Sequence, residues 1–207
     1  MLVLSRKERD RLRRKTDILE AAEHIFALKG YEKATVQDIA EQAEYSIGTI
    51  YLYFKDKYDL YFSLLEEKLR SLLLTIKEKT AAVSTPRESL EVCVKENLAF
   101  FENNKDFFKI FSSVSEELQY SLESKIEKSP LMPAYLEYVE FLMQKAREEG
   151  LVRKEIDPFQ AANVFLSGLK LMVTRWLRQD PKERRDLNSM ANFIIDVIFY
   201  GIGQRHG

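Results

Sequence analysis

Cysteine and histidine are scarce in this chain of 207 residues, which contains one cysteine and two histidines. A single cysteine, Cys93, excludes a disulfide within the chain. His24 and His206 lie too far apart in sequence to form a recognisable zinc-binding pattern. We therefore expect the chain to bind no metal ion and to need no other cofactor.

The sequence also has no long apolar run. No segment reaches the roughly 20 consecutive apolar residues that span a bilayer, and the start MLVLSRKERDRLRRK lacks the apolar stretch of a signal peptide. Hydrophobic residues make up 45% of the chain and charged residues 31%, a balance typical of soluble globular proteins. We expect a cytoplasmic protein that is not associated with a membrane.

Recognisable catalytic groupings are missing as well. The sequence offers no nucleophile with a neighbouring base, no glycine-rich phosphate loop and no clustered pair of carboxylates. Because each of these groupings would be needed for a common class of enzyme chemistry, we do not expect the protein to be an enzyme.

Strand signals are absent, whereas helix signals are frequent. The chain contains no Asn-Gly or Asp-Gly hairpin turn and no sustained alternation of apolar and polar residues. Three sites combine a capping side chain with a proline at the first helical position, which is typical of a helix start. These sites are Thr85-Pro86, Asp157-Pro158 and Asp180-Pro181. We therefore predict an all-α protein of roughly nine helices, short before about residue 55 and long after it.

Glycine and proline also predict where helices end. The first helix, from about Arg6 to Lys29, carries an apolar stripe and is expected to stop at Gly30. Ser129-Pro130 and Pro133 are expected to break the pattern between two later helices, the second of which begins near Ala134 and ends at Gly150.

Positive charge is concentrated near the N-terminus, although the net charge of the chain is only −1. Seven basic side chains, opposed by Glu8 and Asp10, lie between Arg6 and Lys15. Two interpretations carry equal weight. The segment is either a solvated, frayed helix end or an arm that contacts DNA phosphates.

Two short helices with a tight connection are predicted between residues 35 and 54. Thr35 can cap the first helix, with Asp38 three residues on. Ser46 can cap the second, in which Ile50 and Phe54 lie one turn apart and are expected to face the core. The residues left on the outer surface of the second helix are Gly48, Thr49, Tyr51 and Leu52. Two such helices joined by a short turn are typical of a helix-turn-helix.

The outer surface of this second helix suits a DNA groove. A glycine within a helix costs roughly 1 kcal/mol relative to alanine, so Gly48 indicates a point where a partner approaches the backbone closely. Tyrosine and threonine hydroxyls can donate to phosphate oxygens, and Ile47 or Leu52 can contact a thymine methyl group. Ordinary aromatic packing in a small helical bundle is the less favoured interpretation.

The runs ATVQDIAEQA and SIGTIYLYFKDKYDL give residues 16–60 a close resemblance to the DNA-binding domain of the tetracycline-repressor (TetR) family. The resemblance implies a DNA-binding domain over residues 1–56 and an effector-binding and dimerisation domain over residues 57–207. It also implies a homodimer that binds double-stranded operator DNA. The implied DNA contacts are Thr35, Ser46, Ile47, Gly48, Thr49, Tyr51, Leu52, Tyr53 and Lys57.

Two positions depart from the family pattern. Glu44 stands in the turn where many relatives have glycine, so either it adopts a positive φ or the turn differs. Ile47 stands where a basic or polar residue is common in the family. An isoleucine there removes an expected charge contact and makes the operator sequence harder to predict.

Aromatic residues are dense after residue 60. Their helical spacing is typical of a packed core, which is one interpretation of them. The resemblance implies instead an effector cavity enclosed by the middle helices, with aromatic walls. The residues expected to line it are Phe108, Phe111, Tyr138, Phe141 and Trp176. We therefore expect a small apolar or aromatic effector.

Two late apolar stripes predict the homodimer interface, although both could instead be intramolecular core. The predicted interface residues are Ala161, Val164, Phe165, Gly168, Met172, Phe193, Ile194, Val197 and Ile198. A two-fold pair of chains would bind both halves of a palindromic operator.

Together the residues and the resemblance predict a repressor that binds its operator as a dimer and is released by a small effector. Two alternatives stay open. The same fold could act without a small-molecule ligand, as a DNA-organising factor or under the control of a protein partner. The regulator could also activate transcription, because no residue reports where the operator lies relative to a promoter.

Overall fold

The computed structural model describes residues 5–105, 108, 114–179 and 186–201. Within these residues it contains nine α-helices, one π-helical turn and no β-strand, which confirms the predicted all-α class. The helices are α1 (Arg6–Lys33), α2 (Val36–Gln42), α3 (Ile47–Tyr51), α4 (Lys57–Ala81), α5 (Pro86–Asn103), α7 (Glu116–Glu127), α8 (Leu131–Glu148), α9 (Pro158–Arg178) and α10 (Leu187–Asp196), and the π-helical turn is Val197–Gly201. No helix in the described part of the chain is both long and apolar enough to cross a membrane.

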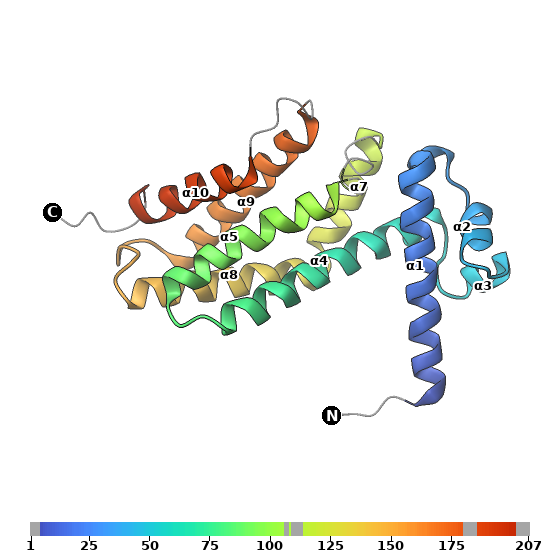
Figure 1. Ribbon diagram of the computed structural model, residues 1–207, viewed down its shortest axis with the longest axis horizontal. Helices are drawn as coiled ribbons and strands as arrows, with labels where there is room; N and C mark the ends of the chain where they lie inside the picture. The colour runs from blue at the N-terminus through green and yellow to red at the C-terminus, as the bar shows by residue number, and fades with distance from the viewer. Residues whose placement is uncertain (1–4, 106–107, 109–113, 180–185, 202–207) are drawn as a thin grey trace.

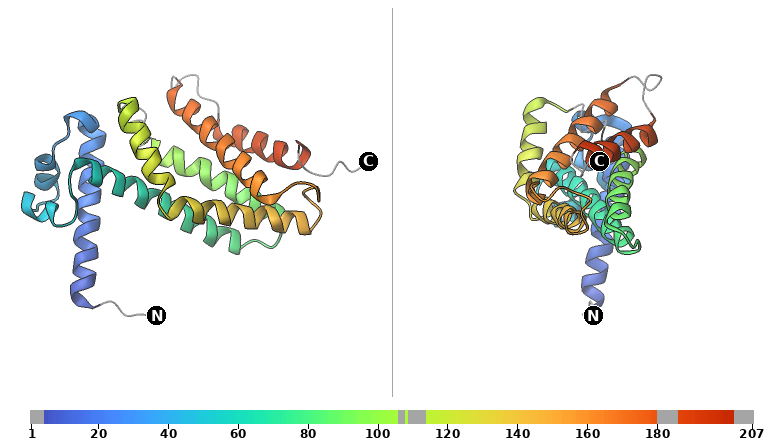
Figure 2. Two further views of the ribbon diagram at one scale, coloured as in Figure 1. Left: turned by 180° about the vertical axis from the view of Figure 1, so that it is seen from behind. Right: turned by 90° about the vertical axis from the view of Figure 1, so that its left-hand side faces the viewer.

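The helices form two parts along the long axis of the molecule (Figure 1). α1 crosses the start of α4 at a steep angle, and α2 and α3 lie on the far side of α1 from the remaining helices. α4, α5 and α8 run along the long axis, and α9 and α10 cover one side of them (Figure 2). The molecule therefore presents α2 and α3 at one end.

Gly30 interrupts α1 where a stop is predicted, although the helix continues to Lys33. Its φ of 74° and ψ of 163° are non-helical, a conformation that suits glycine because it has no Cβ. Tyr31 follows in a further turn and is buried, with its ring centroid 5.7 Å from that of Phe26 and 5.2 Å from that of Tyr61 in α4. The kink thus turns the chain back over α4 and fixes the junction of the two helices.

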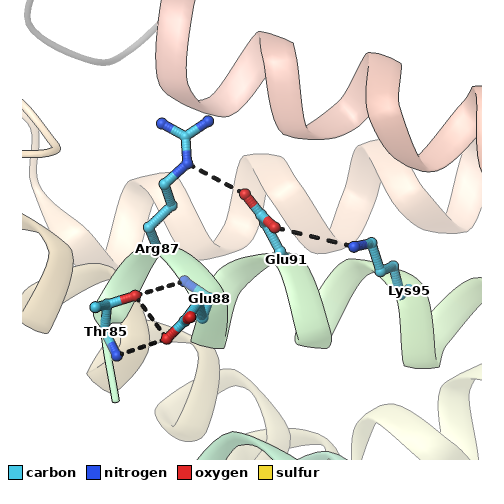
Figure 3. A network of polar contacts seen from close by, with 5 residues as sticks. All are labelled: Thr85, Arg87, Glu88, Glu91 and Lys95. Atoms are coloured by element: carbon cyan, nitrogen blue, oxygen red, sulfur yellow. Dashed lines mark hydrogen bonds and ion pairs between the residues drawn. The ribbon is translucent and has the colours of Figure 1, made fainter. Parts of the chain in front are cut away.

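The predicted helix starts at Thr85 and Asp157 are confirmed. Each side chain accepts a hydrogen bond from the backbone amide three residues on, at 3.2 Å and 2.8 Å respectively. Figure 3 shows the Thr85 cap of α5 together with the ion pairs around Glu91 in the next turn. The third predicted start, Asp180-Pro181, lies outside the described residues.

The predicted break is confirmed at Ser129-Pro130, which lies between α7 and α8, but is wrong at Pro133. α8 begins at Leu131, so Pro133 lies in its first turn instead of preceding it. Proline is tolerated there because the first amides of a helix have no intrahelical partner. Gly150 lies just beyond the end of α8 with a φ of 75°, as expected of a glycine that ends a helix.

A buried polar cluster joins α5 to α8. Asn97 donates to the carbonyl oxygen of Cys93 at 2.8 Å and accepts a hydrogen bond from the hydroxyl of Tyr135. All three residues are buried, and burial raises the pKa of the Cys93 thiol to about 12. The amide group of Asn97 is thus bonded on both sides, as a buried polar group needs to be.

Candidate nucleic-acid interface and apolar groove

Thr35 and Asp38 form the capping box that starts α2. Thr35 Oγ1 accepts a hydrogen bond from the Asp38 amide at 3.1 Å, and Asp38 Oδ2 accepts one from the Thr35 amide at 3.0 Å. Lys29 Nζ of α1 lies 2.7 Å from Asp38 Oδ1. The Lys29 ammonium and the bonds with Thr35 lower the pKa of Asp38 from its ordinary value. α2 is therefore tied to the end of α1, with Thr35 exposed at its N-terminus.

A tight turn centred on Glu44 joins α2 to α3. The amides of Glu44 and Tyr45 donate to carbonyl oxygens near the end of α2, at 3.2 Å and 3.0 Å, in the pattern of a Schellman motif. Glu44 has a φ of 58°. Of the two outcomes expected at this position, the structure shows the positive φ, which costs roughly 1–2 kcal/mol in a residue with a Cβ.

Ser46 caps α3 as predicted. Its Oγ accepts a hydrogen bond from the Thr49 amide at 3.1 Å and lies 2.8 Å from Thr49 Oγ1. Ile50 and Phe54 are 1% and 2% exposed, which confirms that this side of the helix faces the core. The opposite side of α3 is consequently turned to solvent.

The structure places most of the predicted DNA contacts on one exposed surface. Its exposed members are Thr35, Ser46, Ile47, Gly48, Tyr51 and Leu52. Leu52 is 78% exposed and Tyr51 is 54% exposed, so large side chains stand away from the core. Thr49 and Tyr53 are half-buried. This surface combines hydroxyl groups, apolar side chains and an accessible stretch of backbone, which is the chemistry that contacts in a DNA groove require.

Lys57, the last of the predicted DNA contacts, is bonded to the chain itself. Its Nζ donates to the carbonyl oxygens of Tyr31 at 2.8 Å, Ala34 at 3.1 Å and Glu32 at 3.2 Å, all beyond the kink in α1. It also lies 4.4 Å from the centroid of the Tyr31 ring. Because a lysine has three ammonium donors, a phosphate could bind Lys57 only by displacing one of these bonds.

Replacing Lys57 with methionine should lower the free energy of unfolding by roughly 2 kcal/mol, because three carbonyl groups lose a charged donor. The matched control is Lys55→Met, which removes the same charge from an exposed residue just before α4. Urea unfolding followed by circular dichroism measures both variants. Equal stability of the two would contradict the structural role of Lys57.

Two polar bridges connect α1 and the first half of α4 to later parts of the chain. Lys68 Nζ of α4 lies 2.7 Å from Glu23 Oε1 of α1 and donates to Asn104 Oδ1, after α5, at the same distance. Lys125 Nζ of α7 lies 3.4 Å from Asp59 Oδ1 near the start of α4. Neither bridge is predicted from the sequence. Lys68 and Asn104 are 36 residues apart in the chain, and Lys125 and Asp59 are 66 residues apart, so no local pattern indicates these contacts.

Two of the predicted effector residues lie at one end of the α4–α5 pair. The hydroxyl of Tyr138 is hydrogen-bonded to Thr80, near the end of α4. The Tyr138 ring stacks on Phe141 with 6.0 Å between centroids, and Phe141 is 49% exposed. This pair therefore lies beside the surface of the molecule.

The other predicted effector residues are placed elsewhere. Phe108 is buried against Phe101 and Phe100 near the end of α5, with centroid distances of 4.6 Å and 5.8 Å. Trp176 is buried in α9, and Phe111 lies outside the described residues. The structure therefore does not gather the predicted effector residues into one site, and Phe108 lies at the end of α5 opposite to Tyr138.

An apolar groove of about 380 Å³ lies between α9 and α10. All nine residues of the predicted dimer interface line it. Phe165, Ile194 and Ile198 are buried in the chain's own core, whereas Val164 is 74% exposed and Phe193 is 58% exposed. The predicted stripes thus contribute both to the core and to an exposed apolar surface.

Known proteins resemble the chain over most of its length. It is 25% identical over 185 residues to the fatty acid metabolism regulator protein of Bacillus subtilis (strain 168), which covers 89% of this chain and 93% of that protein. It is 24% identical over 193 residues to the HTH-type transcriptional repressor KstR2 of Rhodococcus jostii (strain RHA1), covering 93% of each. The crystal structure of FadR from Bacillus subtilis in complex with stearoyl-CoA matches with a TM-score of 0.72 and 24% identity, over 90% of this chain and 98% of that one.

Family models match both parts of the chain. Residues 18–64, which contain the helix-turn-helix, match the model described as bacterial regulatory proteins, tetR family. Residues 65–201 match the model described as YsiA-like protein, C-terminal region. Because the two matches are contiguous and agree with the exposed helix-turn-helix, the chain belongs to the tetR family of bacterial regulatory proteins and is a DNA-binding regulator of transcription.

Proposed function

We propose that the protein is a repressor that binds a palindromic operator as a homodimer and leaves it when an acyl-coenzyme A binds in the C-terminal domain. The observation that carries the proposal is the two-sided character of α3. Ile50 is buried on its core side, while Gly48, Tyr51 and Leu52 are exposed on the other. A helix of this kind fits the major groove of B-DNA, where such groups reach base edges, thymine methyl groups and phosphates.

The groove between α9 and α10 supports the homodimer. Its exposed apolar side chains, among them Val164 and Phe193, would be costly to leave in water. A second copy of the chain related by a two-fold axis would cover the same residues on both protomers. Two α3 helices could then enter successive major grooves about 34 Å apart, as two halves of a palindrome require.

The relatives support an effector with an apolar chain. The fatty acid metabolism regulator and the FadR complex with stearoyl-CoA both point to acyl compounds, in line with the apolar effector expected from the aromatic residues. We place the acyl chain beside the cluster of Phe100, Phe101 and Phe108, whose ring centroids are 4.6–5.8 Å apart. The name of KstR2 as a repressor supports repression.

The polar bridge at Lys68 gives this location a route to the DNA. Asn104 follows Phe100 and Phe101 at the end of α5 and accepts a hydrogen bond from Lys68, which also pairs with Glu23 of α1. An acyl chain that displaces the end of α5 would alter this bridge and tilt α1 with α2 and α3. Both protomers must fit one operator at the same time, so a small tilt lowers the affinity for DNA. The size of this loss is the coupling free energy between the effector site and the DNA-binding surface.

The proposal is tested in two steps with the purified chain. Selection from a random duplex pool should yield an inverted repeat, and fluorescence anisotropy with that site should show that stearoyl-CoA lowers affinity at least about tenfold. Free coenzyme A and stearate are the matched controls, because each carries only half of the effector. A selected site without two-fold symmetry would contradict the dimeric operator. Unchanged affinity with acyl-coenzymes of every chain length would contradict the effector and favour control by a protein partner.

A further inference from the structure

The first three turns of α1 project beyond the rest of the protein. Every residue from 5 to 16 is exposed, and Figures 1 and 2 show the N-terminal half of α1 extending past α2, α3 and the C-terminal helices. The N-terminal arm, residues 6–15, carries seven basic side chains and two acidic ones. A helix that contacts so little of its own chain and concentrates one sign of charge fits an anionic partner.

The start of the arm is capped and not frayed. Ser5 Oγ accepts a hydrogen bond from the Glu8 amide at 3.2 Å, and the Ser5 amide donates to Glu8 Oε2 at 2.8 Å. These bonds lower the pKa of Glu8. The capping box therefore keeps the basic side chains in helical order, and one of the two acidic side chains in the arm is engaged in the cap.

One face of the arm lies on the side of α1 that contacts the start of α3. The Tyr45 hydroxyl, one residue before the cap of α3, donates to Asp17 Oδ2 of α1 at 2.8 Å. Asp17 raises the pKa of Tyr45, and the nearby positive charges of Arg14 and Arg13 oppose that rise. With 3.6 residues per turn, Arg6, Arg13 and the acidic Asp10 lie on the same face of α1 as Asp17, and Arg14 lies beside them, so this face carries three positive charges and one negative charge within the arm. The net positive face of the arm thus leads towards Tyr45, the residue that precedes Ser46 at the start of α3.

We propose that Arg6, Arg13 and Arg14 bind DNA phosphates beside the half-site contacted by α3 of the same protomer. The inference rests on the proposed DNA-binding function and adds a second contact surface to it. The arm of ten residues is about 15 Å long at 1.5 Å per residue, which matches the phosphates of about four base pairs at 3.4 Å per step. Arginine suits this contact because its planar group can donate two hydrogen bonds to one phosphate.

The experiment compares two double variants of the full chain that lose the same charge. Arg6→Gln with Arg13→Gln removes two charges from the face of Asp17, whereas Arg11→Gln with Lys15→Gln removes two from the other side of α1. Operator affinity is measured at several salt concentrations on the selected duplex. Since each phosphate contact contributes about 0.9 to the slope of log K against log salt, the first variant should lose about 1.8 in slope and on the order of tenfold in affinity, while the second keeps the wild-type slope.

Ethylation interference supplies a readout that general charge cannot imitate. The wild-type chain and the Arg11/Lys15 variant should be prevented from binding by ethylation at the same set of phosphates. For the Arg6/Arg13 variant, ethylation at a few adjacent phosphates of that set should no longer affect binding. Equal slopes and equal interference for both variants would overturn the arm contact. A wild-type chain that binds no duplex at all would overturn the proposed function instead. Matching thermal melts show that both variants are folded, since all four residues are exposed.

Discussion

A single glutamate in the apolar groove, introduced as Val164→Glu, should convert the dimer into monomers and lower operator affinity by at least about 100-fold. Val164 is 74% exposed in the single chain, so the folded protomer tolerates the charge. In the proposed interface the two-fold axis would bring one glutamate from each protomer into an apolar contact. An unpaired buried charge costs about 3–5 kcal/mol. Because the dimer would bury two such charges, the total cost should exceed the free energy that holds the two protomers together.

Sedimentation equilibrium measures the loss of the dimer, and fluorescence anisotropy with the operator measures the loss of affinity. Leu74→Glu is the matched control, because Leu74 is 61% exposed on α4 and does not line the groove. The control should remain dimeric and bind DNA normally. A dimer that survives Val164→Glu, or a Leu74→Glu variant that dissociates equally, would show that the chain pairs through another surface.

The groove shows how far a periodic pattern can define an apolar surface. Spacing of apolar residues at three and four selects nine residues, and all nine are among those that line the groove. The same spacing cannot divide them between core and partner, because Phe165 and Ile194 are buried while Val164 and Phe193 are exposed on the same two helices. That division depends on how α9 packs on α8 and α10 on α5, which is a property of the whole fold.

The helix-turn-helix could be predicted more completely, because its signals are local. The caps at Thr35 and Ser46 and the burial of Ile50 and Phe54 follow from spacings of three and four residues. Lys57 is the exception in this region. Its three acceptors lie 23 to 26 residues earlier in the chain, so sequence alone could not distinguish a residue that binds phosphate from one that secures α1.

The effector residues were the least predictable. Aromatic side chains at helical spacing are compatible with a core, a cavity wall and a surface, and the structure shows Phe108 buried while Phe141 is 49% exposed. The predicted residues lie at opposite ends of the α4–α5 pair. Tyr138, which stacks on Phe141, contacts the end of α4, whereas Phe108 contacts the end of α5. The positions of Tyr138 and Phe141 depend on how α8 packs against α4, and no local sequence pattern predicts that packing.

Gly48→Ala should stabilise the protein and weaken operator binding at the same time. An added Cβ at Gly48 would meet only Ser46 Oγ, at an ordinary contact distance of 3.8 Å, so the fold has room for it. Alanine in a helix gains roughly 0.5–1 kcal/mol over glycine, which raises the melting temperature by about 1–4 °C in a chain of this size.

The same methyl group would stand between α3 and the DNA if Gly48 faces the groove as proposed. Loss of a close base contact costs about 1–3 kcal/mol, so anisotropy should show operator affinity reduced about 5- to 150-fold. Ser71→Ala is the matched control, since it also improves helix propensity at an exposed residue, but on α4. It should leave affinity unchanged. Wild-type affinity of the Gly48→Ala variant would mean that DNA does not approach this backbone, because a change that the fold accepts can weaken binding only through the partner.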